Sequence, residues 1–258
     1  MKVLFFGDVF GRPGRSGIKR FIEENKTKNK IDLVIANVDN VASGRGPTQK
    51  TYRELLDAGV DVMTSGDHIW DRKEVSNILE EKNSKLLRPL NYPKLCPGKG
   101  SIEINIGGIV VLIVSMLGRV WTTEGLESPF DKIDEVIEKS KAKIKIIDFH
   151  AEATSEKIAF GRYVAGRVSA VLGTHTHVQT ADERIINKTA LISDVGFCGP
   201  NESVIGVEQD QSIKRFRTGM PVTFDVAEGP VQINAVVVTV DDKTGETKKI
   251  ERIFEILD

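Results

Sequence analysis

The sequence predicts an α/β protein in which two stacked mixed β-sheets are flanked by helices. Apolar runs alternate with amphipathic segments of helical length over the first third of the chain, as in βαβ units. A pair of glycines in the middle suits an antiparallel hairpin, and the C-terminal third alternates apolar and polar residues. We expect a single domain over residues 1–258, because no linker, repeat or low-complexity segment divides the chain.

The first third is expected to alternate strands and helices. Val3 to Phe6 predicts a buried strand, and the glycines after it predict a turn at Gly11 to Gly14. An amphipathic helix is expected from about Ser16 to Lys28. Further along we expect a strand at Leu33 to Ala36, a helix from Thr48 to Asp57 and a strand at Val60 to Thr64. Strands joined through helices run parallel, so this sheet should be largely parallel.

Beyond Leu86 the pattern becomes richer in strands. Ser101 to Ile106 and Ile109 to Ser115 flank Gly107-Gly108, which suits the type I′ turn of a hairpin. A helix is expected at Pro129 to Lys141, and strands are expected at Ile144 to Asp148, Ala170 to Gly173 and Ala190 to Ser193. Alternating residues predict three last strands, at Val222 to Val226, Val231 to Val240 and Lys249 to Ile256, with a turn at Asp241 to Gly245.

Charge and cysteine content exclude several classes of protein. The 36 Lys and Arg residues balance 37 acids, which argues against a protein that coats nucleic acid. Cys96 and Cys198 belong to no CxxC motif or Cys/His pair, so we expect reduced thiols and a cytoplasmic location. No apolar run approaches the ~20 residues of a membrane span, and the chain begins with a predicted strand rather than a signal peptide.

The histidines stand at the ends of predicted strands. His68, His150, His175 and His177 are the only ones in the chain, and each follows an apolar run. Asp8 and Asp39 arrive in the same way. Strand ends are where α/β enzymes place functional groups. A single buried histidine is more often a hydrogen-bonded core residue, but the coincidence of all four favours a site.

The side chains at these strand ends form a donor set typical of metal ligands: Asp8, Asp39, Asn40, Asp67, His150, His175 and His177. This set is too large for one tetrahedral zinc ion and suits two ions that share a carboxylate. No thiolate takes part, so Fe, Mn, Zn or Co are candidates, and the residues do not choose among them.

The order of these motifs resembles the calcineurin-like metallophosphoesterase superfamily. The matching blocks are Gly7-Asp8, Asn37 to Asn40, Gly66-Asp67-His68, His150 and Gly173 to His177. Over essentially its full length the chain is similar to bacterial YmdB-like 2′,3′-cyclic-nucleotide phosphodiesterases, including the longer blocks Asp148 to Lys157, Gly173 to Asp182 and Asp194 to Gly196. The resemblance implies a metallophosphoesterase-type sandwich of two mixed β-sheets flanked by helices.

The resemblance also implies a role for each donor. Asp8, Asn40 and His177 would hold one metal ion, and Asp67, His150 and His175 would hold the other. Asp39 would bridge the two ions, and His68 would be the general acid near the scissile phosphate without being a ligand. The cofactor would be two divalent or mixed-valence ions of Fe, Mn or Zn.

The reaction that the resemblance implies is hydrolysis of small phosphodiesters, above all 2′,3′-cyclic nucleotides to 3′-nucleotides. A hydroxide between the metals would attack, and His68 would protonate the departing ribose oxygen. The alternative is a metal-containing regulator or nucleotide sensor with little turnover. A dinucleotide-binding site is disfavoured, because Gly11, Gly14 and Gly17 do not have GxGxxG spacing.

The chain departs from the wider superfamily in its first, second and third blocks. Asp8-Val9-Phe10 stands where other members carry Asp-x-His, which agrees with the YmdB-like subgroup. The family usually has Glu where Asp39 stands and Asn where Asp67 stands. One hypothesis is that the two changes compensate: where the shorter Asp39 cannot span both metals, Asp67 supplies the bridging carboxylate.

Two further expectations concern support and assembly. Glu152, Thr176 and Asp194 are candidates for orienting the ligand imidazoles, although Glu152 is equally explained as a carboxylate at a helix start. A homo-oligomer is possible, because the β-rich C-terminal third has sheet edges to cover.

Overall fold

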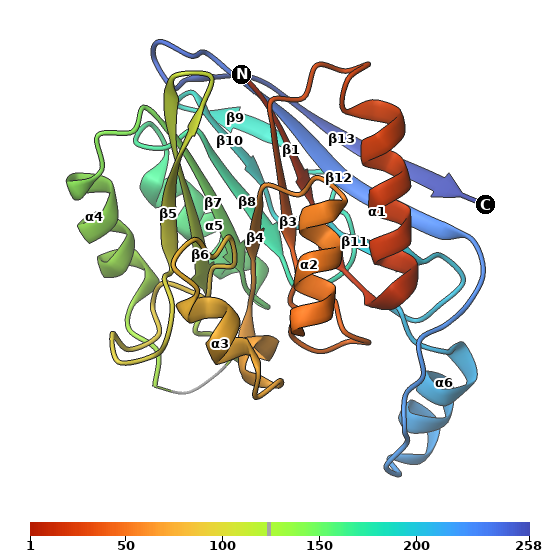
Figure 1. Ribbon diagram of the computed structural model, residues 1–258. Helices are drawn as coiled ribbons and strands as arrows, with labels where there is room; N and C mark the ends of the chain where they lie inside the picture. The colour runs from red at the N-terminus through yellow and green to blue at the C-terminus, as the bar shows by residue number, and fades with distance from the viewer. Residues whose placement is uncertain (123–124) are drawn as a thin grey trace.

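The central strands are apolar on both faces, and each face is covered by another layer. In β1 (Lys2–Phe6), Val3 and Phe5 pack between two sheets, whereas Leu4 and Phe6 pack against helices. The computed structural model, which describes residues 1–122 and 125–258, accordingly stacks two mixed sheets between outer helices (Figure 1). The predicted fold class is confirmed.

The two sheets differ in their proportion of parallel strands. The first contains, in order, β2 (Asp8–Val9), β11 (Phe197–Pro200), β12 (Val231–Val240), β1, β3 (Leu33–Asn37) and β4 (Val62–Thr64), and β13 (Thr247–Leu257) pairs with β12. The second contains β5 (Ser101–Ile106), β6 (Ile109–Leu117), β7 (Ile144–His150), β8 (Ala170–Thr174), β10 (Thr189–Ile192) and β9 (Arg184–Ile186). β1, β3 and β4 are parallel, as are β6, β7, β8 and β10.

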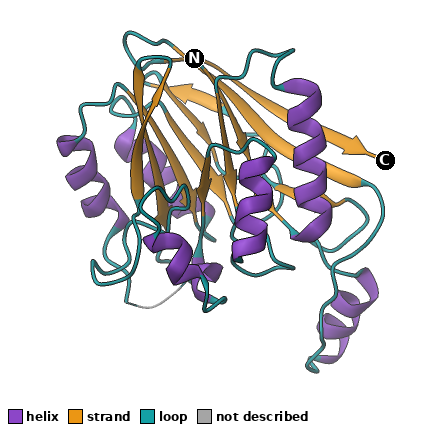
Figure 2. Cartoon of the chain, viewed as in Figure 1, coloured by secondary structure: helices purple, strands orange, loops and turns teal. Residues whose placement is uncertain are grey.

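Helices cover the outer faces of both sheets (Figure 2). α1 (Gly11–Asn25), α2 (Gln49–Asp57) and α3 (Val75–Glu80) pack on the first sheet, and α4 (Pro129–Lys139) and α5 (Thr154–Val164) pack on the second. A short 3₁₀ helix, η1 (Asp67–Trp70), follows β4, and α6 (Gln209–Thr218) projects from the body of the molecule. Within residues 1–122 and 125–258, no helix is long and apolar enough to cross a bilayer.

The predicted turn at Gly11 to Gly14 and the predicted start of the helix at Ser16 both needed correction. The predicted glycine turn at Gly11 to Gly14 is the first turn of α1, which begins five residues before Ser16. The glycines serve close packing: a Cβ at Gly14 would overlap the carbonyl of Cys198, and one at Gly17 would lie 2.7 Å from Val231. These glycines therefore let α1 approach β11 and β12 closely, and they do not form the turn that was predicted after the first strand.

The predicted strand at Val222 to Val226 was wrong. This segment joins no sheet, and only Val226 forms an isolated bridge, with Val207. Alternation marks a strand only where a neighbour supplies hydrogen bonds and one face is covered, and residues 221–225 are largely exposed. The preceding helix α6 escaped prediction because Ser212 is its only buried residue, so no apolar stripe marks it. The helix α3 was not predicted, and of α5 only a start near Glu152 was considered.

The predicted hairpin was confirmed. β5 and β6 pair antiparallel around Gly107 and Gly108, whose φ angles of 59° and 91° lie in the left-handed region that a type I′ turn requires. The strands predicted at residues 231–240 and 249–256 correspond to β12 and β13, which pair along their length. The free thiols of Cys96 and Cys198 also agree with expectation.

Replacement of Ile146 by alanine tests the packing between the sheets. This β7 side chain is fully buried in the layer between them, so we expect Ile146→Ala to lower the free energy of unfolding by about 2–5 kcal/mol. Ile185→Ala is the matched control, because Ile185 is 42% exposed and should cost well under 1 kcal/mol. Urea unfolding followed by circular dichroism measures both; equal losses would contradict a close-packed core between the sheets.

Candidate metal centre

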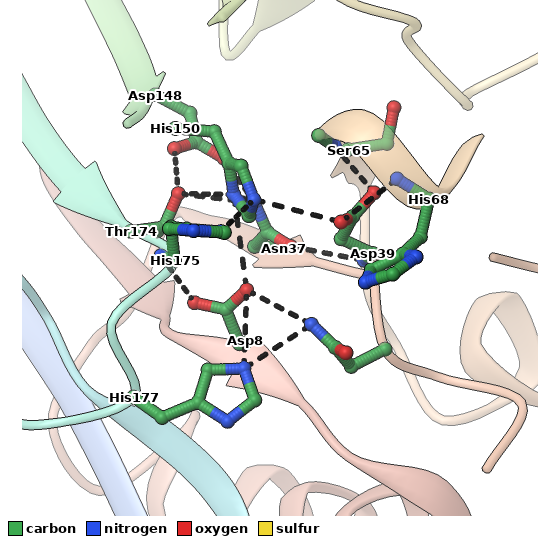
Figure 3. A network of polar contacts seen from close by, with 12 residues as sticks. Asp8, Asn37, Asp39, Ser65, His68, Asp148, His150, Thr174, His175 and His177 are labelled. Carbon is green, nitrogen blue, oxygen red and sulfur yellow. Dashed lines mark hydrogen bonds and ion pairs between the residues drawn. The ribbon is translucent and has the colours of Figure 1, made fainter. Parts of the chain in front are cut away.

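The predicted donor residues gather where the parallel strands of both sheets end (Figure 3). Asp8 follows β1, Asp39 and Asn40 follow β3, and Asp67 follows β4, all in the first sheet. His150 is the last residue of β7, and His175 and His177 follow β8, in the second sheet. Polar contacts join all of them into one network, so the structure brings the whole set together.

Asp67, His150 and His175 converge on one point. The Nε2 atom of His150 lies 3.3 Å from Oδ1 of Asp67 and 3.0 Å from Nδ1 of His175. One donor atom from each residue lies within 4.8 Å of the other two. Oδ1 of Asp67 is buried and makes no hydrogen bond, only these ion-pair contacts. A buried carboxylate oxygen that faces two imidazoles is a good fit for a cation.

Asp8, Asn40 and His177 form a second group, in which all three side chains are buried. The Asn40 amide nitrogen lies 3.4 Å from Oδ1 of Asp8 and 3.2 Å from Nε2 of His177, and the last two atoms are 3.8 Å apart. An amide binds a metal through its oxygen, so coordination would require the Asn40 amide to turn over. The donor chemistry otherwise fits a divalent ion of the Fe, Mn or Zn type.

Asp39 supports the turn that carries Asp67 and His68. Its Oδ1 accepts a hydrogen bond from the Gly66 N–H at 2.6 Å, and its Oδ2 accepts one from the His68 N–H at 3.2 Å. Oδ2 also lies 3.5 Å from Nε2 of His150. Asp8 links the two groups: it accepts a hydrogen bond from the His175 N–H at 3.0 Å and lies 3.8 Å from His150. The bridging role of Asp39 stays a prediction.

Burial and mutual attraction set the charges of this cluster. Burial raises the pKa of Asp39 to about 6, against the opposing pull of His150. Burial by itself would lower the pKa of His150, but Asp39, Asp67 and Asp8 more than reverse this and raise it to about 10. The metal-free cluster thus holds a proton on His150. A bound cation would replace that proton, because a ligating imidazole must be neutral.

A buried polar network below His150 was not predicted. Nδ1 of His150 lies 2.9 Å from Oγ1 of Thr174, and that hydroxyl donates to Asp148 at 2.7 Å. Asp148 also accepts hydrogen bonds from the Thr64 hydroxyl and the Asn37 amide. Because Thr174 uses its proton on Asp148, it accepts from His150 and leaves Nε2 to face Asp67. The sequence signal for this network was the presence of polar residues, such as Asp148 and Thr174, within strands that are otherwise largely apolar.

The other histidines are oriented by single contacts. Nε2 of His175 lies 2.9 Å from Glu152, which leaves Nδ1 to face the centre, and Nδ1 of His177 lies 3.0 Å from the carbonyl of Ile205. Glu152 thus has the contact expected of an orienting residue. Thr176 and Asp194 hydrogen-bond to each other rather than to an imidazole, so their expected role needs correction: they hold the backbone of the loop.

His68 lies at the rim of the cluster. Its side chain is 40% exposed, and its Nδ1 lies 3.0 Å from Oδ2 of Asp71. This position outside the converging donors suits a residue that faces the substrate. Asp71 was not among the predicted residues, although its spacing of three residues from His68 in a helical turn was visible in the sequence.

His177, which faces Asp8 in the donor cluster, also lines a groove. Its volume is about 470 Å³, and the exposed apolar side chains of Val178, Ile205 and Phe254 line it. The amides of Asn201, Gln232 and Asn234 line it as well. Ile205 has a φ of 49°, rare for a β-branched residue, and the same residue offers its carbonyl to His177.

Comparison with known proteins adds independent findings. The family described as YmdB-like protein matches residues 4–253. The chain is 45% identical over 257 residues to a Bacillus subtilis 2′,3′-cyclic-nucleotide 2′-phosphodiesterase, covering 98% of this chain and 97% of the relative. A crystal structure described as a novel phosphatase from Mycoplasma pneumoniae superposes with a TM-score of 0.94 at 38% identity, covering 100% of this chain and 94% of that one.

A more distant likeness concerns the fold alone. A 5′-nucleotidase precursor from Thermus thermophilus superposes with a TM-score of 0.56 at 12% identity, covering 100% of this chain and 54% of that one. The two-sheet architecture is therefore shared with proteins of very different sequence.

The buried carboxyl group of Asp148 should make stability depend on pH. Burial raises its pKa to about 6 from an ordinary 3.8, although His150 and the hydrogen bonds from Thr64 and Thr174 lower it. The folded protein then holds this proton more tightly than the unfolded chain, so ionisation destabilises the fold as pH rises from about 4 to about 7.

Asp148→Asn removes this titration. We expect the unfolding free energy of the metal-free wild type to fall relative to the variant over that pH range, by up to about 3 kcal/mol. Denaturant unfolding in excess chelator at several pH values measures the difference. A difference that is constant with pH would mean that Asp148 ionises in the folded protein as easily as in water.

Proposed function

The chain belongs to the YmdB-like protein family, and on this premise we propose that it is a metal-dependent phosphodiesterase that opens 2′,3′-cyclic nucleotides to 3′-nucleotides. The observation that carries the proposal is the convergence of Asp67, His150 and His175 on one point, beside the buried group of Asp8, Asn40 and His177. The Bacillus subtilis relative, whose name specifies cleavage of the 2′ ester, supports the choice of substrate.

Each group of donors would hold one metal ion. Asp67, His150 and His175 would hold the first, and Asp8, Asn40 and His177 the second. Asp39 or Asp67, the two acids at positions where the resemblance implies Glu and Asn, would supply a carboxylate to both ions. A bound metal pair would supply positive charge for the phosphate oxygens and lower the pKa of a water molecule.

His68 would act as the general acid. Its Nδ1 faces Asp71, so its Nε2 would be the atom that donates a proton to the departing 2′ oxygen. The contact with the Asp71 carboxylate would fix the plane of the ring. The partly exposed position of His68 leaves room for a substrate against it.

For the nucleoside part of the substrate, we propose the groove beside His177. Its volume of about 470 Å³ lies within the ~300–1,000 Å³ typical of small-molecule sites. Phe254 offers a flat apolar surface for a base, and the Asn201 and Gln232 amides offer hydrogen bonds to its edge. His177 would join the groove to the metal centre, because it lines the one and faces Asp8 in the other.

Alanine at His68 tests the general acid. We expect His68→Ala to lower turnover of 2′,3′-cyclic AMP by ~10²- to 10⁴-fold in the manganese-loaded enzyme, because no group would protonate the leaving oxygen. Elemental analysis should give the same manganese content as in the wild type. Loss of metal would make His68 a ligand, and an inactive wild type with both sites full would favour the regulator or sensor.

Alanine at Phe254 tests the nucleoside site. We expect Phe254→Ala to raise KM for 2′,3′-cyclic AMP by ~10-fold, the effect of losing one base-stacking ring, with little change for bis-p-nitrophenyl phosphate. Phe216→Ala is the matched control, because Phe216 is 85% exposed on α6 and does not line the groove. Unchanged KM for the cyclic nucleotide would place the base elsewhere and leave the diesterase proposal standing.

A further inference from the structure

We propose that the buried ion pair of Lys157 and Asp194 positions the metal centre by holding together the two backbone segments that supply donors from different sheets. Neither residue belongs to the donor set. The inference rests on the proposed metal centre, and it concerns two buried residues that are not proposed to touch the substrate. It assigns to Asp194 a role in positioning backbone, with Lys157 as the charge that makes this role possible.

Asp194 is saturated with hydrogen bonds in a buried place. Its side chain is 1% exposed. One oxygen, Oδ2, accepts from the Lys157 ammonium at 2.7 Å, from the Thr176 N–H at 2.9 Å and from the Thr176 hydroxyl at 2.7 Å. The other oxygen accepts from the Gly196 N–H at 2.8 Å. A carboxylate that receives this many donors fixes the position of each.

Thr176 stands between two donor residues with unfavourable backbone angles. His175 has a φ of 105° and His177 a φ of 64°, both in the region that favours glycine. Such conformations persist in other residues only where the surroundings hold them. Asp194 holds both the N–H and the hydroxyl of Thr176, the residue between the two. This contact fixes the residue from which the His175 and His177 backbone extends on either side.

Asp194 also reaches the segment that carries Asp8. The Gly196 N–H donates to Asp194, and the Gly196 carbonyl accepts from the Asp8 N–H at 3.0 Å. Gly7 lies so close to Gly196 that a Cβ at Gly7 would overlap this carbonyl. Asp8 begins β2 in the first sheet, whereas the histidine loop follows β8 in the second. Asp194 therefore ties the donors of one sheet to those of the other.

Lys157 supplies the positive charge that pairs with the buried Asp194 carboxylate. It reaches in from α5, and its side chain is 4% exposed. Without it, the carboxylate would be buried with only neutral donors, and a buried charge that loses its partner is strongly destabilising. The pair therefore has two separable effects: it keeps the protein folded, and it keeps the donors in register.

The test is the affinity of the chelator-treated protein for manganese. We expect Lys157→Met to weaken manganese binding by ~10- to 100-fold, as for other residues that orient metal ligands, with titration calorimetry as the measurement. Lys132→Met is the matched control: Lys132 is 11% exposed and pairs with Glu127 and Glu135, outside the donor set. It should bind manganese as the wild type does. Lys157→Arg, which keeps the charge, should recover part of the affinity.

A double variant separates positioning from stability. In Lys157→Met/Asp194→Asn no buried charge lacks a partner, so its thermal midpoint should rise above that of Lys157→Met, whereas its manganese affinity should stay low. This variant also serves if Lys157→Met alone does not fold. Wild-type affinity in folded Lys157→Met, or affinities that follow the thermal midpoints across all variants, would overturn the proposal. A wild type that binds no manganese would instead overturn the metal centre itself.

Discussion

Negative charge buried where the two sheets meet is the constraint on which the rest of the structure depends. Asp8, Asp39 and Asp148 are completely buried, and Asp67 lies 3.3 Å from the buried His150 imidazole. Carboxylates in such a place need protons, hydrogen bonds or cations, because their desolvation is costly. His150, whose pKa is raised to about 10, supplies positive charge beside these carboxylates. Oδ1 of Asp67, which makes no hydrogen bond, marks where a metal ion would supply more.

The fold meets this constraint through its parallel strands. Five strands from two sheets end at one side of the molecule, and each has a candidate donor at its end or within three residues after it. Backbone N–H groups then hold the carboxylates: Gly66 and His68 donate to Asp39, and His175 donates to Asp8. The apolar layers between and outside the sheets pack against the strands that lead to these donors.

Three parts of the structure surround this centre: a buried polar layer, the rim of the cluster and a groove. The layer below His150, with Thr174 and Asp148, fixes which nitrogen faces the donors. The rim carries His68 with Asp71, where a leaving group could receive a proton, and the groove beyond His177 offers apolar and amide surface for a nucleoside. Lys157 pairs with Asp194, which accepts hydrogen bonds from the Thr176 N–H and hydroxyl and from the Gly196 N–H.

Sequence patterns by themselves determined the fold class, the hairpin at Gly107-Gly108, most strands and which polar residues stand near the strand ends, because apolar periodicity and strand-end motifs are local properties. They misplaced the start of α1 and added a strand at Val222 to Val226, where the outcome depended on close approach to Cys198 and on a missing neighbour. Only the tertiary structure decided which imidazole nitrogen faces the centre, that Asp71 partners His68, and that Asp194 ties Asp8 to the histidine loop. Those contacts join residues from separate strands and helices, and no spacing along a chain specifies which of them will touch across two sheets.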